Sequence, residues 1–575
     1  MPLAAVLLAG AGAAVWSNSF ACPFIFDDVP TIQENPHVET LWPIGEAMSA
    51  PADTTASGRP LVSLSLAMNY AVSGRNVWSY HALNLAVHVL AGLTLFGIVR
   101  RARLSSAAME ARFAGRSGLP ARGPDQTGKQ ADWLALAVAL IWLVHPLQTQ
   151  AVTYVVQRAE SMMGLFYLLT VYLAARGMAP LPSPARPRGA PVRQDDAASP
   201  AARRWPGGWM ALSVLACAAG MAAKETMATA PLMVLLYDRT FAAGSFRQAI
   251  ARRWRPYTGL AATWLILAAL VAGQPRETSA GFGLATFTPL GYALTQGGVI
   301  LHYLHLAFWP RPLVLDYHWP AATAPGQWAP QAAAVLALLA ATAAAMRLRP
   351  ILGFIGAWFF LILAPTSTFV PIADPIFEHR MYLPLAAIVA AAVGGSWLAG
   401  RRLVRRAALA RGLAVASLAA TVILLGWLTH SRNHDYRSAV AIWTDTAAKQ
   451  PASPRAYMQL GAAYRAQDQY DQAIACYDKS LTLDAGYAKA YLGRGIALAC
   501  KEQYGPAMGD LDKAVSLAPG YYLSYANRAF LRLELGQYEP AIADFRRAAD
   551  LNPTDSWVRQ GLREAQAAAS RPARP

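Results

Sequence analysis

Apolar stretches recur along the chain up to about residue 430, and short polar segments separate them. A helix needs about 20 apolar residues to cross a bilayer, and tilt or flanking aromatic residues adjust that length. We therefore expect about eleven membrane-spanning helices with soft boundaries. Their ranges are 2–21, 81–99, 132–146, 160–175, 209–222, 226–238, 257–273, 331–346, 351–365, 381–400 and 412–430.

Residues 291–309 form a further apolar stretch. If this stretch also crossed the bilayer, the basic segment at 347–349 would lie on the opposite side from the other basic loops. We therefore expect residues 291–309 to form an interfacial or re-entrant helix.

The pattern changes after about residue 440, where the long apolar stretches end and the sequence begins to repeat itself. An offset of 34 residues aligns Tyr457 with Tyr491 and Tyr525, and it aligns small residues such as Ala473 and Ala507. This period is typical of tetratricopeptide repeats, which are stacked helical hairpins. Such a stack has a concave face that suits an extended partner segment. The tyrosines expected to bind a partner there are Tyr457, Tyr464, Tyr491 and Tyr525.

Together these patterns predict an all-α protein with two parts. Residues 1–430 form a polytopic membrane domain, whose first external loop is residues 22–80. A linker helix follows at 431–453, and residues 454–569 form three repeats with a capping helix. Residues 570–575 are a tail. The repeats alone are also consistent with a role limited to assembly.

The composition supports the membrane assignment. Hydrophobic residues make up 55% of the chain and charged residues only 14%, and the mean hydropathy is +0.27. A soluble globular protein rarely has this balance, and a disordered chain is not this apolar. The four cysteines are scattered without a CxxC pair, so we expect neither a disulfide framework nor a zinc site.

The net charge of +17 does not indicate a nucleic-acid partner, because the cations lie in short loops between the apolar stretches. Positive residues gather on the cytoplasmic side of membrane proteins. The basic loops at 100–129, 176–204, 239–255, 347–349 and 401–411 are therefore expected to be cytoplasmic. This topology predicts a multi-pass protein of the cell (inner) membrane, with its repeats on the extracytoplasmic side.

Two adjacent carboxylates, Asp27 and Asp28, follow the first apolar stretch and are the first candidates for chemistry. Partial burial raises the pKa of a carboxylate toward the range where it acts as a general base for a hydroxyl group. The alternative is a helix cap followed by a polar turn.

Other charged and polar side chains lie close to the ends of the apolar stretches, where they are costly unless they serve a function. His81, Asn84 and His88 share one helical face, which we expect to point into the bundle. Arg158 either contacts a phosphate or pairs with Glu160. The remaining candidates are Arg59, His145, Lys224, Glu225, Glu378, Arg380 and Tyr382.

Several of these candidates have a simpler alternative role. Lys224 and Glu225 could form a local ion pair. Arg380 could either bind a lipid-linked phosphate or extend to lipid head groups. A metal site at His81 and His88 would lack nearby carboxylates, so hydrogen bonding within the bundle is the better explanation, and we expect no metal site.

The order of these motifs resembles that of the transmembrane and tetratricopeptide-repeat-containing proteins, which are similar to protein O-mannosyltransferases of the polytopic GT-C class. The resemblance is carried by the Asp27–Asp28 pair, YHALNLAVH, HPLQTQAVTYVVQRAE, the Lys224–Glu225 pair, FWPRPLVLDY and EHRMYLP. It covers most of residues 20–575. Eukaryotic members have HPVHTEAV where this chain has HPLQTQAV, so Gln148 and Gln150 replace a histidine and a glutamate.

The resemblance implies a GT-C-like membrane domain that transfers a sugar from a polyprenyl phosphate to Ser or Thr hydroxyls of exported proteins. The sugar that the resemblance implies is mannose. Asp27 or Asp28 would be the base or would orient the acceptor. Arg380, Arg158 and Lys224 would contact the donor phosphate. The supporting polar residues would be Arg59, His81, His145, Glu225, Glu378 and Tyr382.

The chain shows no glycine-rich nucleotide loop, which is consistent with a lipid-linked donor, and we expect no cofactor. Two other functions stay open at this stage. The first is a GT-C enzyme whose acceptor is a glycolipid or polysaccharide, and the second is a non-catalytic membrane scaffold that acts through its repeats.

Overall fold

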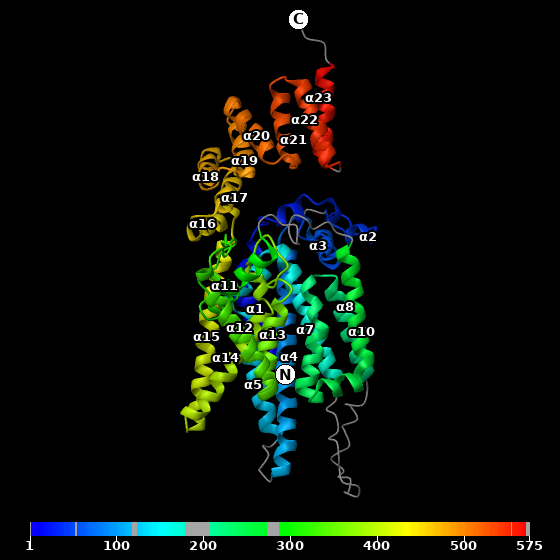
Figure 1. Cartoon of the computed structure of the whole chain (residues 1–575), viewed down its shortest axis with the longest axis vertical. Coiled ribbons are helices and arrows are strands. Elements are labelled where there is room, and N and C mark those ends of the chain that lie inside the picture. The colour runs from blue at the N-terminus through cyan, green and yellow to red at the C-terminus, as the bar shows by residue number, and fades with distance from the viewer. Residues whose placement is uncertain are drawn as a thin grey trace. The chain divides into compact units, whose positions relative to one another are not determined.

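The computed structural model describes residues 2–51, 54–117, 124–178, 206–272, 287–553 and 555–570. It describes only the backbone of 108–117, 124–126 and 206. Throughout these ranges the regular structure is helical, with no β-strand, which confirms the expected all-α class (Figure 1). The chain divides into a membrane unit, Met1–Leu313 with Trp319–Arg437, and a repeat unit, Val314–His318 with Ser438–Pro575.

Long helices build the membrane unit, and each predicted apolar stretch overlaps one of them. They are α1 (Pro2–Val15), α3 (Pro60–Ser73), α4 (Trp78–Ser117), α5 (Pro124–Leu143), α7 (Arg158–Gly177), α8 (Pro206–Met221), α9 (Ala230–Asp238), α10 (Phe246–Ala272), α11 (Pro289–Phe308), α12 (Pro325–Leu348), α13 (Pro350–Leu363), α14 (Pro384–Leu403) and α15 (Ala407–Asp435). Two single-turn helices, α2 (Ile44–Ala47) and α6 (Thr149–Val152), lie between them.

Not every one of these helices has the length and composition of a membrane span. Among the described residues, 5 helices qualify, or up to 6 if the bent pair Thr127–Leu143 and Pro146–Val152 forms one span. Three apolar helices, including α1 and α13, are shorter. The expected eleven spans therefore remain a prediction. Most of the basic loop at 176–204 and the tail at 571–575 lie outside the described residues.

Close packing in the membrane unit depends on small residues. A Cβ atom on Gly97 of α4 would lie 2.6 Å from the Tyr172 ring of α7, and one on Gly164 of α7 would lie 2.4 Å from Tyr382. Both positions thus let helices approach more closely than a side chain would allow.

The repeat unit contains α16 (Ala439–Lys449) and three helical hairpins. The hairpins are α17 (Pro454–Arg465) with α18 (Tyr470–Leu483), α19 (Ala488–Cys500) with α20 (Tyr504–Leu517), and α21 (Tyr522–Glu534) with α22 (Tyr538–Leu551). Helix α23 (Ser556–Ala569) follows the last hairpin, where a capping helix is expected. The buried Tyr477 ring fills the space beside Gly461 and Gly493, which explains why these two positions lack side chains.

A short segment from far upstream completes the repeat unit. Residues Val314–His318 belong to it, and Asp316 is 5% exposed. One oxygen of Asp316 accepts a hydrogen bond of 3.3 Å from the Ser453 hydroxyl, and the other lies 3.6 Å from Arg455. Both partners begin the first repeat. The repeat period alone did not reveal this contribution.

Candidate active site

The loop at residues 22–80, which the charge pattern predicts to be external, follows α1 and is attached to α4 through polar and aromatic contacts. The ring nitrogen Nε2 of His81 lies 2.9 Å from the Cys22 carbonyl oxygen. The Phe24 ring meets the edge of the Tyr80 ring at a centroid distance of 5.1 Å. These contacts set the path of the chain immediately before the two aspartates.

Asp28 is fully buried and lies inside the loop. Its carboxylate accepts a hydrogen bond of 3.1 Å from the N–H of Ile25 and another of 2.7 Å from the N–H of Val156. Burial raises the pKa of Asp28 to about 8, and these backbone bonds oppose the shift. The geometry therefore gives Asp28 the role of joining the loop to the segment before α7.

Asp27 is partly exposed, in contrast to its neighbour. Its backbone N–H donates to the Tyr154 hydroxyl at 2.9 Å, and its carboxylate is also hydrogen-bonded to this hydroxyl. Burial, together with the two aspartates, raises the pKa of Tyr154 well above its usual value. Phe26, the residue before, has φ of 49°, a left-handed conformation that costs a non-glycine residue about 1 kcal/mol or more. The Asp27 side chain is thus held at the surface of the loop by a strained turn and a neutral phenol.

Arg158 at the start of α7 is fully buried and joins α3, α4 and α7. Its guanidinium donates to the Asn84 and Asn69 side-chain oxygens, both at 2.6 Å, and to the Tyr80 carbonyl at 2.9 Å. It also donates to the carbonyl and hydroxyl oxygens of Ser65. Arg158 pairs with neither Glu160 nor another carboxylate through these bonds, so its geometry is that of a structural crosslink.

Two ion pairs form between segments that are distant in sequence, at the end of α8. The ammonium of Lys224 donates to the Glu160 carboxylate at 2.5 Å, and both side chains are nearly buried. Arg59 lies 3.5 Å from the Glu225 carboxylate, and these side chains are 20% and 28% exposed. Each residue thus has a partner that is distant in sequence, and the Glu225 carboxylate also acts electrostatically on Lys224.

Arg59 retains capacity for a further acceptor. One of its terminal nitrogens donates to the Thr55 carbonyl at 2.8 Å, while the buried Nε has no hydrogen-bond partner in the part of the chain that the structure describes. Burial lowers the pKa of Lys224, and the nearby Glu160 carboxylate opposes the shift. A partly exposed guanidinium beside a nearly buried ammonium suits an anionic group.

A chain of hydrogen bonds connects the Asp27 turn to this cationic cluster. The Thr31 N–H donates to the Asp27 carbonyl at 3.3 Å, and the hydroxyls of Thr31 and Thr55 lie 3.1 Å apart. Thr55 in turn accepts from Arg59. The end of α8 is attached as well, because the Leu61 N–H donates to the Ala222 carbonyl at 3.3 Å. The aspartate turn and the cations are therefore parts of one connected end of the membrane unit.

The segment before α14 adds His379 and Arg380, both nearly buried. The oxygen of the Gln150 amide lies 3.1 Å from the His379 ring nitrogen Nδ1. Burial lowers the pKa of His379 well below its usual value, and Lys224 adds to the shift, so the ring is neutral at pH 7. Gln150 thus provides an amide oxygen where the resembling eukaryotic proteins have a carboxylate.

Arg380 holds its own loop together. Its two terminal nitrogens donate to the carbonyls of Pro375 at 2.7 Å and Asp374 at 2.8 Å, and its guanidinium lies over the Phe377 ring. Glu378, next to it, is fully buried. Carbonyl oxygens therefore occupy much of the donor capacity of Arg380.

Tyr382 and the predicted histidines lie deeper in the unit. The Tyr382 hydroxyl is 2.9 Å from His88 Nδ1, and the Trp142 indole donates to the Tyr382 carbonyl. His145 accepts from the Leu147 N–H, and its other ring nitrogen is 3.1 Å from the Ala307 carbonyl. With His81, Asn84 and His88 all buried, the helical face they share points inward as expected. These residues position the site from below.

The four tyrosines expected to bind a partner are partly buried between the repeat helices. Tyr464 and Tyr491 pack against the core around Tyr477, and Tyr525 packs against the core around Phe545. The guanidinium of Arg528 lies 5.7 Å from the Tyr525 ring. Packing therefore accounts for a large part of these aromatic surfaces. Among the residues that the structure describes, no group of three or more His, Cys, Asp or Glu side chains could hold a metal ion.

Three contributors were not singled out from the sequence: Tyr154, Thr55 and Glu160 as the partner of Lys224. Tyr154 belongs to the motif that carried the family resemblance, and an isolated glutamate near an apolar helix is itself a signal. No local pattern points to Thr55, because its role depends on the folding of the external loop.

Comparison with known proteins shows two kinds of similarity. Models of the tetratricopeptide repeat match residues 454–487 and 522–555. Protein O-mannosyl-transferase TMTC1 of Mus musculus is 32% identical over 175 residues, and the match covers 29% of this chain and 16% of that protein. Protein O-mannosyl-transferase Tmtc2 of Drosophila melanogaster is 26% identical, with 39% of this chain and 20% of that protein covered.

Part of the chain is thus similar in sequence to the TMTC proteins. The chain also contains tetratricopeptide repeats and helices that are long and apolar enough to cross a membrane. The matched part spans about a sixth of the length of TMTC1. Among solved structures, the first tetratricopeptide domain of Spaghetti (RPAP3), bound to an HSP90 peptide, is 27% identical. That match covers 21% of this chain and 94% of that domain, with a TM-score of 0.20.

Proposed function

We propose that this protein is a membrane glycosyltransferase that moves a sugar from a polyprenyl-phosphate donor to Ser or Thr hydroxyls of exported proteins. By analogy with the named relatives, the proposed sugar is mannose. The named relatives are O-mannosyl-transferases, which supports the reaction class. The observation that carries the proposal is the partly exposed Asp27 turn, which hydrogen bonds connect to the Arg59–Lys224 cluster.

In the proposed reaction, the Asp27 carboxylate accepts the proton of the acceptor hydroxyl. The hydroxyl oxygen forms a bond to the anomeric carbon of the sugar as the bond from that carbon to the phosphate oxygen breaks. The bonding electrons leave with the polyprenyl phosphate. Tyr154, whose raised pKa keeps it protonated, would orient the carboxylate by hydrogen bonding.

Arg59 and Lys224 would stabilise the charge that develops on the leaving phosphate. The unpartnered Nε of Arg59 and the proximity of two cations support this assignment. Arg158 and Arg380 were the other candidates for the phosphate. We propose positioning roles for both, because their guanidinium groups already donate to protein oxygens.

Asp28 would position rather than react, since its oxygens accept two backbone N–H groups inside the loop. Glu225, Glu378, His81, His145 and Tyr382 would support the site from around and below it. We further propose that the protein resides in the cell (inner) membrane and that the repeats hold the acceptor polypeptide or a partner.

The test is a transfer assay with the purified full-length chain, a mannosyl polyprenyl phosphate and a Ser/Thr-rich peptide. Wild-type protein should produce hexosylated peptide, and Asp27→Asn should lose at least about 100-fold of the rate, the usual minimum for a general base. Glu39→Gln, a change of an exposed carboxylate in the same loop, is the matched control. Transfer by the wild type to a glycolipid but not to peptides would contradict the protein acceptor, and no transfer by the wild type would favour the scaffold function.

A further inference from the structure

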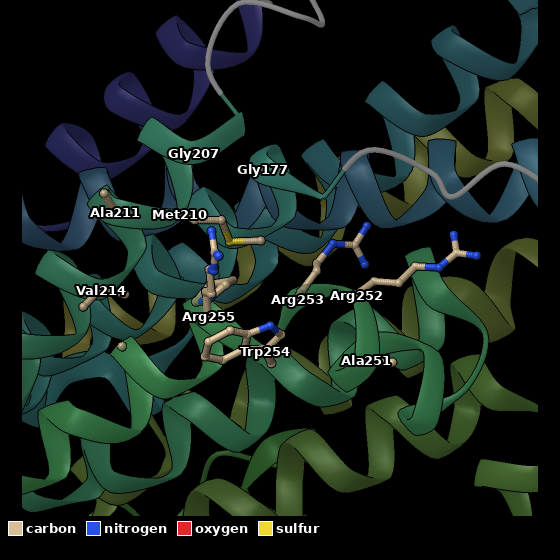
Figure 2. A pocket seen from close by; sticks show the side chains of 12 residues that line it. Gly177, Gly207, Met210, Ala211, Val214, Ala251, Arg252, Arg253, Trp254 and Arg255 are labelled. Carbon is tan, nitrogen blue, oxygen red and sulfur yellow. The ribbon is translucent and has the colours of Figure 1, made fainter.

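A cavity of about 700 Å³ opens between α7, α8 and α10, away from the candidate active site. Figure 2 shows the cluster Arg252, Arg253, Trp254 and Arg255 of α10 beside Met210 of α8. The mechanism proposed above uses none of these residues.

The cavity lies at the opposite ends of the helices that reach the active site. Helix α7 begins with Arg158 near the site and ends at Gly177, which lines the cavity. Helix α8 begins beside Gly207, another lining residue, and its end leads to Ala222 and Lys224 at the site. The 16 residues of α8 separate the two places by about 24 Å.

One of the three arginines is neutralised within the protein. Arg253 donates two hydrogen bonds, of 2.7 and 2.9 Å, to the buried carboxylate of Asp238, which also accepts from the Tyr257 hydroxyl. Arg253 has φ of −133° and ψ of 32°, which interrupts α10. The ion pair with Asp238 anchors α10 at this break.

The other two arginines have no such partner. Arg252 and Arg255 are exposed and form no ion pair with any residue that the structure describes. Arg255 lies over the ring of Trp254, which is 55% exposed. Tryptophan and arginine together are typical of the boundary between the acyl chains and the head groups of a membrane. The two cations thus offer an uncompensated positive site at that boundary.

The inner wall of the cavity is apolar. Met210, Ala211 and Val214 of α8 line it, and a Cβ atom added to Gly207 would meet nothing within 4 Å. A small hydrated anion gains nothing from such a wall. A molecule with an anionic head and an acyl chain matches both the cations and the apolar surface.

We propose that this cavity binds an anionic glycerophospholipid, with its phosphate at the arginine cluster that contains Arg252 and Arg255 and an acyl chain against α8. The proposal does not depend on the glycosyltransferase reaction. It adds a structural lipid site, distinct from the proposed donor site, at the end of the bundle that the charge pattern predicts to be cytoplasmic.

The experiment measures the thermal stability of the purified full-length protein in neutral detergent during titration with phosphatidylglycerol. Phosphatidylcholine and inorganic phosphate are titrated in parallel. The wild type should be stabilised by phosphatidylglycerol alone. In the double variant Arg252→Gln/Arg255→Gln, the apparent affinity should fall on the order of 25-fold, since each cation near a membrane surface contributes roughly a fivefold factor.

The matched control is Arg401→Gln/Arg402→Gln, which removes the same charge from the end of α14. It should keep the wild-type response. A second variant, Gly207→Leu, fills the cavity without changing its charge and should also weaken the response to phosphatidylglycerol. If phosphatidylglycerol stabilised Arg252→Gln/Arg255→Gln and Arg401→Gln/Arg402→Gln equally, the proposed site would be overturned. Equal stabilisation by inorganic phosphate, or an unchanged response of Gly207→Leu, would overturn the lipid as its occupant.

Discussion

The Asp28 carboxylate accepts the Val156 N–H at 2.7 Å, across 128 residues of sequence. Asp27 at its side is instead partly exposed and is hydrogen-bonded to Tyr154. Two identical residues in succession therefore have different environments, and we propose different roles for them. In this proposal Asp28 fixes the loop in place, and Asp27 acts on the acceptor.

The first prediction concerns stability. Asp28→Asn replaces one acceptor oxygen with an NH₂ group that faces a backbone N–H, so the free energy of unfolding should fall by about 1–3 kcal/mol. Asp27→Asn should leave thermal stability close to wild type. Thermal unfolding of both variants in the same detergent measures the difference. Equal stability of the two variants would contradict the separate roles.

The pH dependence of stability follows from the same residue. The pKa of Asp28 is raised to about 8 in the folded protein, so the folded state keeps a proton that the unfolded state releases above about 4. Stability contributed by this group should therefore decrease as the pH rises from about 4 to about 8 and then level off. The check compares unfolding temperatures of the wild type and Asp28→Asn from pH 5 to pH 9. If the unfolding temperature changed equally with pH in both proteins, Asp28 would not be the source of the pH dependence.

The Lys224–Glu160 pair should behave as one unit. Because both side chains are nearly buried, Lys224→Met or Glu160→Gln alone leaves a charge without its partner and should destabilise the fold by about 3–5 kcal/mol. The double variant should lose clearly less than the sum of the two losses. A double-mutant cycle by chemical or thermal unfolding measures this coupling, and additive losses would show that the residues are independent.

Arg158 should prove structural. Arg158→Lys cannot reproduce the fork of bonds to Asn84, Asn69 and the Tyr80 carbonyl, so we expect loss of several kcal/mol or failure to purify a monodisperse protein. Arg59→Lys, at a partly exposed position, should remain folded with a raised KM for the donor. Size-exclusion profiles report whether each variant is folded and monodisperse, and donor titrations report its KM for the donor. A well-folded Arg158→Lys protein with only a donor defect would restore Arg158 as a phosphate ligand.

The repeat unit offers an independent prediction. Arg528 bonds the Asp544 carboxylate through two nitrogens, at 2.8 and 2.7 Å, and also reaches Asp512. Arg528→Gln should increase hydrogen exchange in α21 and α22 relative to the matched change Arg563→Gln on α23. Identical exchange in both variants would mean that these ion pairs contribute little.

Periodic features of the sequence predicted the elements well. Each apolar stretch overlaps a helix, and the 34-residue period matches the hairpins, because both signals are local and repeat along the chain. The inward face of His81, Asn84 and His88 followed from helical spacing in the same way. The number of membrane spans did not follow from the apolar stretches alone, because several of the helices are shorter than a bilayer requires.

Partnerships across the fold could not be read from the sequence. Lys224 donates to Glu160, which lies 64 residues away, and Arg158 donates to the side-chain oxygen of Asn84 on another helix. The segment around Asp316 joins the repeat unit although it lies more than a hundred residues upstream. In each case the tertiary structure determines which partner is close. Local charge and residue spacing do not reveal that partner.

The most direct test of the central claim compares the transfer rate of wild type, Asp27→Asn and Asp27→Glu under saturating donor and acceptor. We predict that Asp27→Asn folds like the wild type and loses at least about 100-fold of the rate, while Asp27→Glu, which keeps a carboxylate, recovers part of it. A folded Asp27→Asn protein that transfers sugar at the wild-type rate would contradict the assignment of Asp27 as the base.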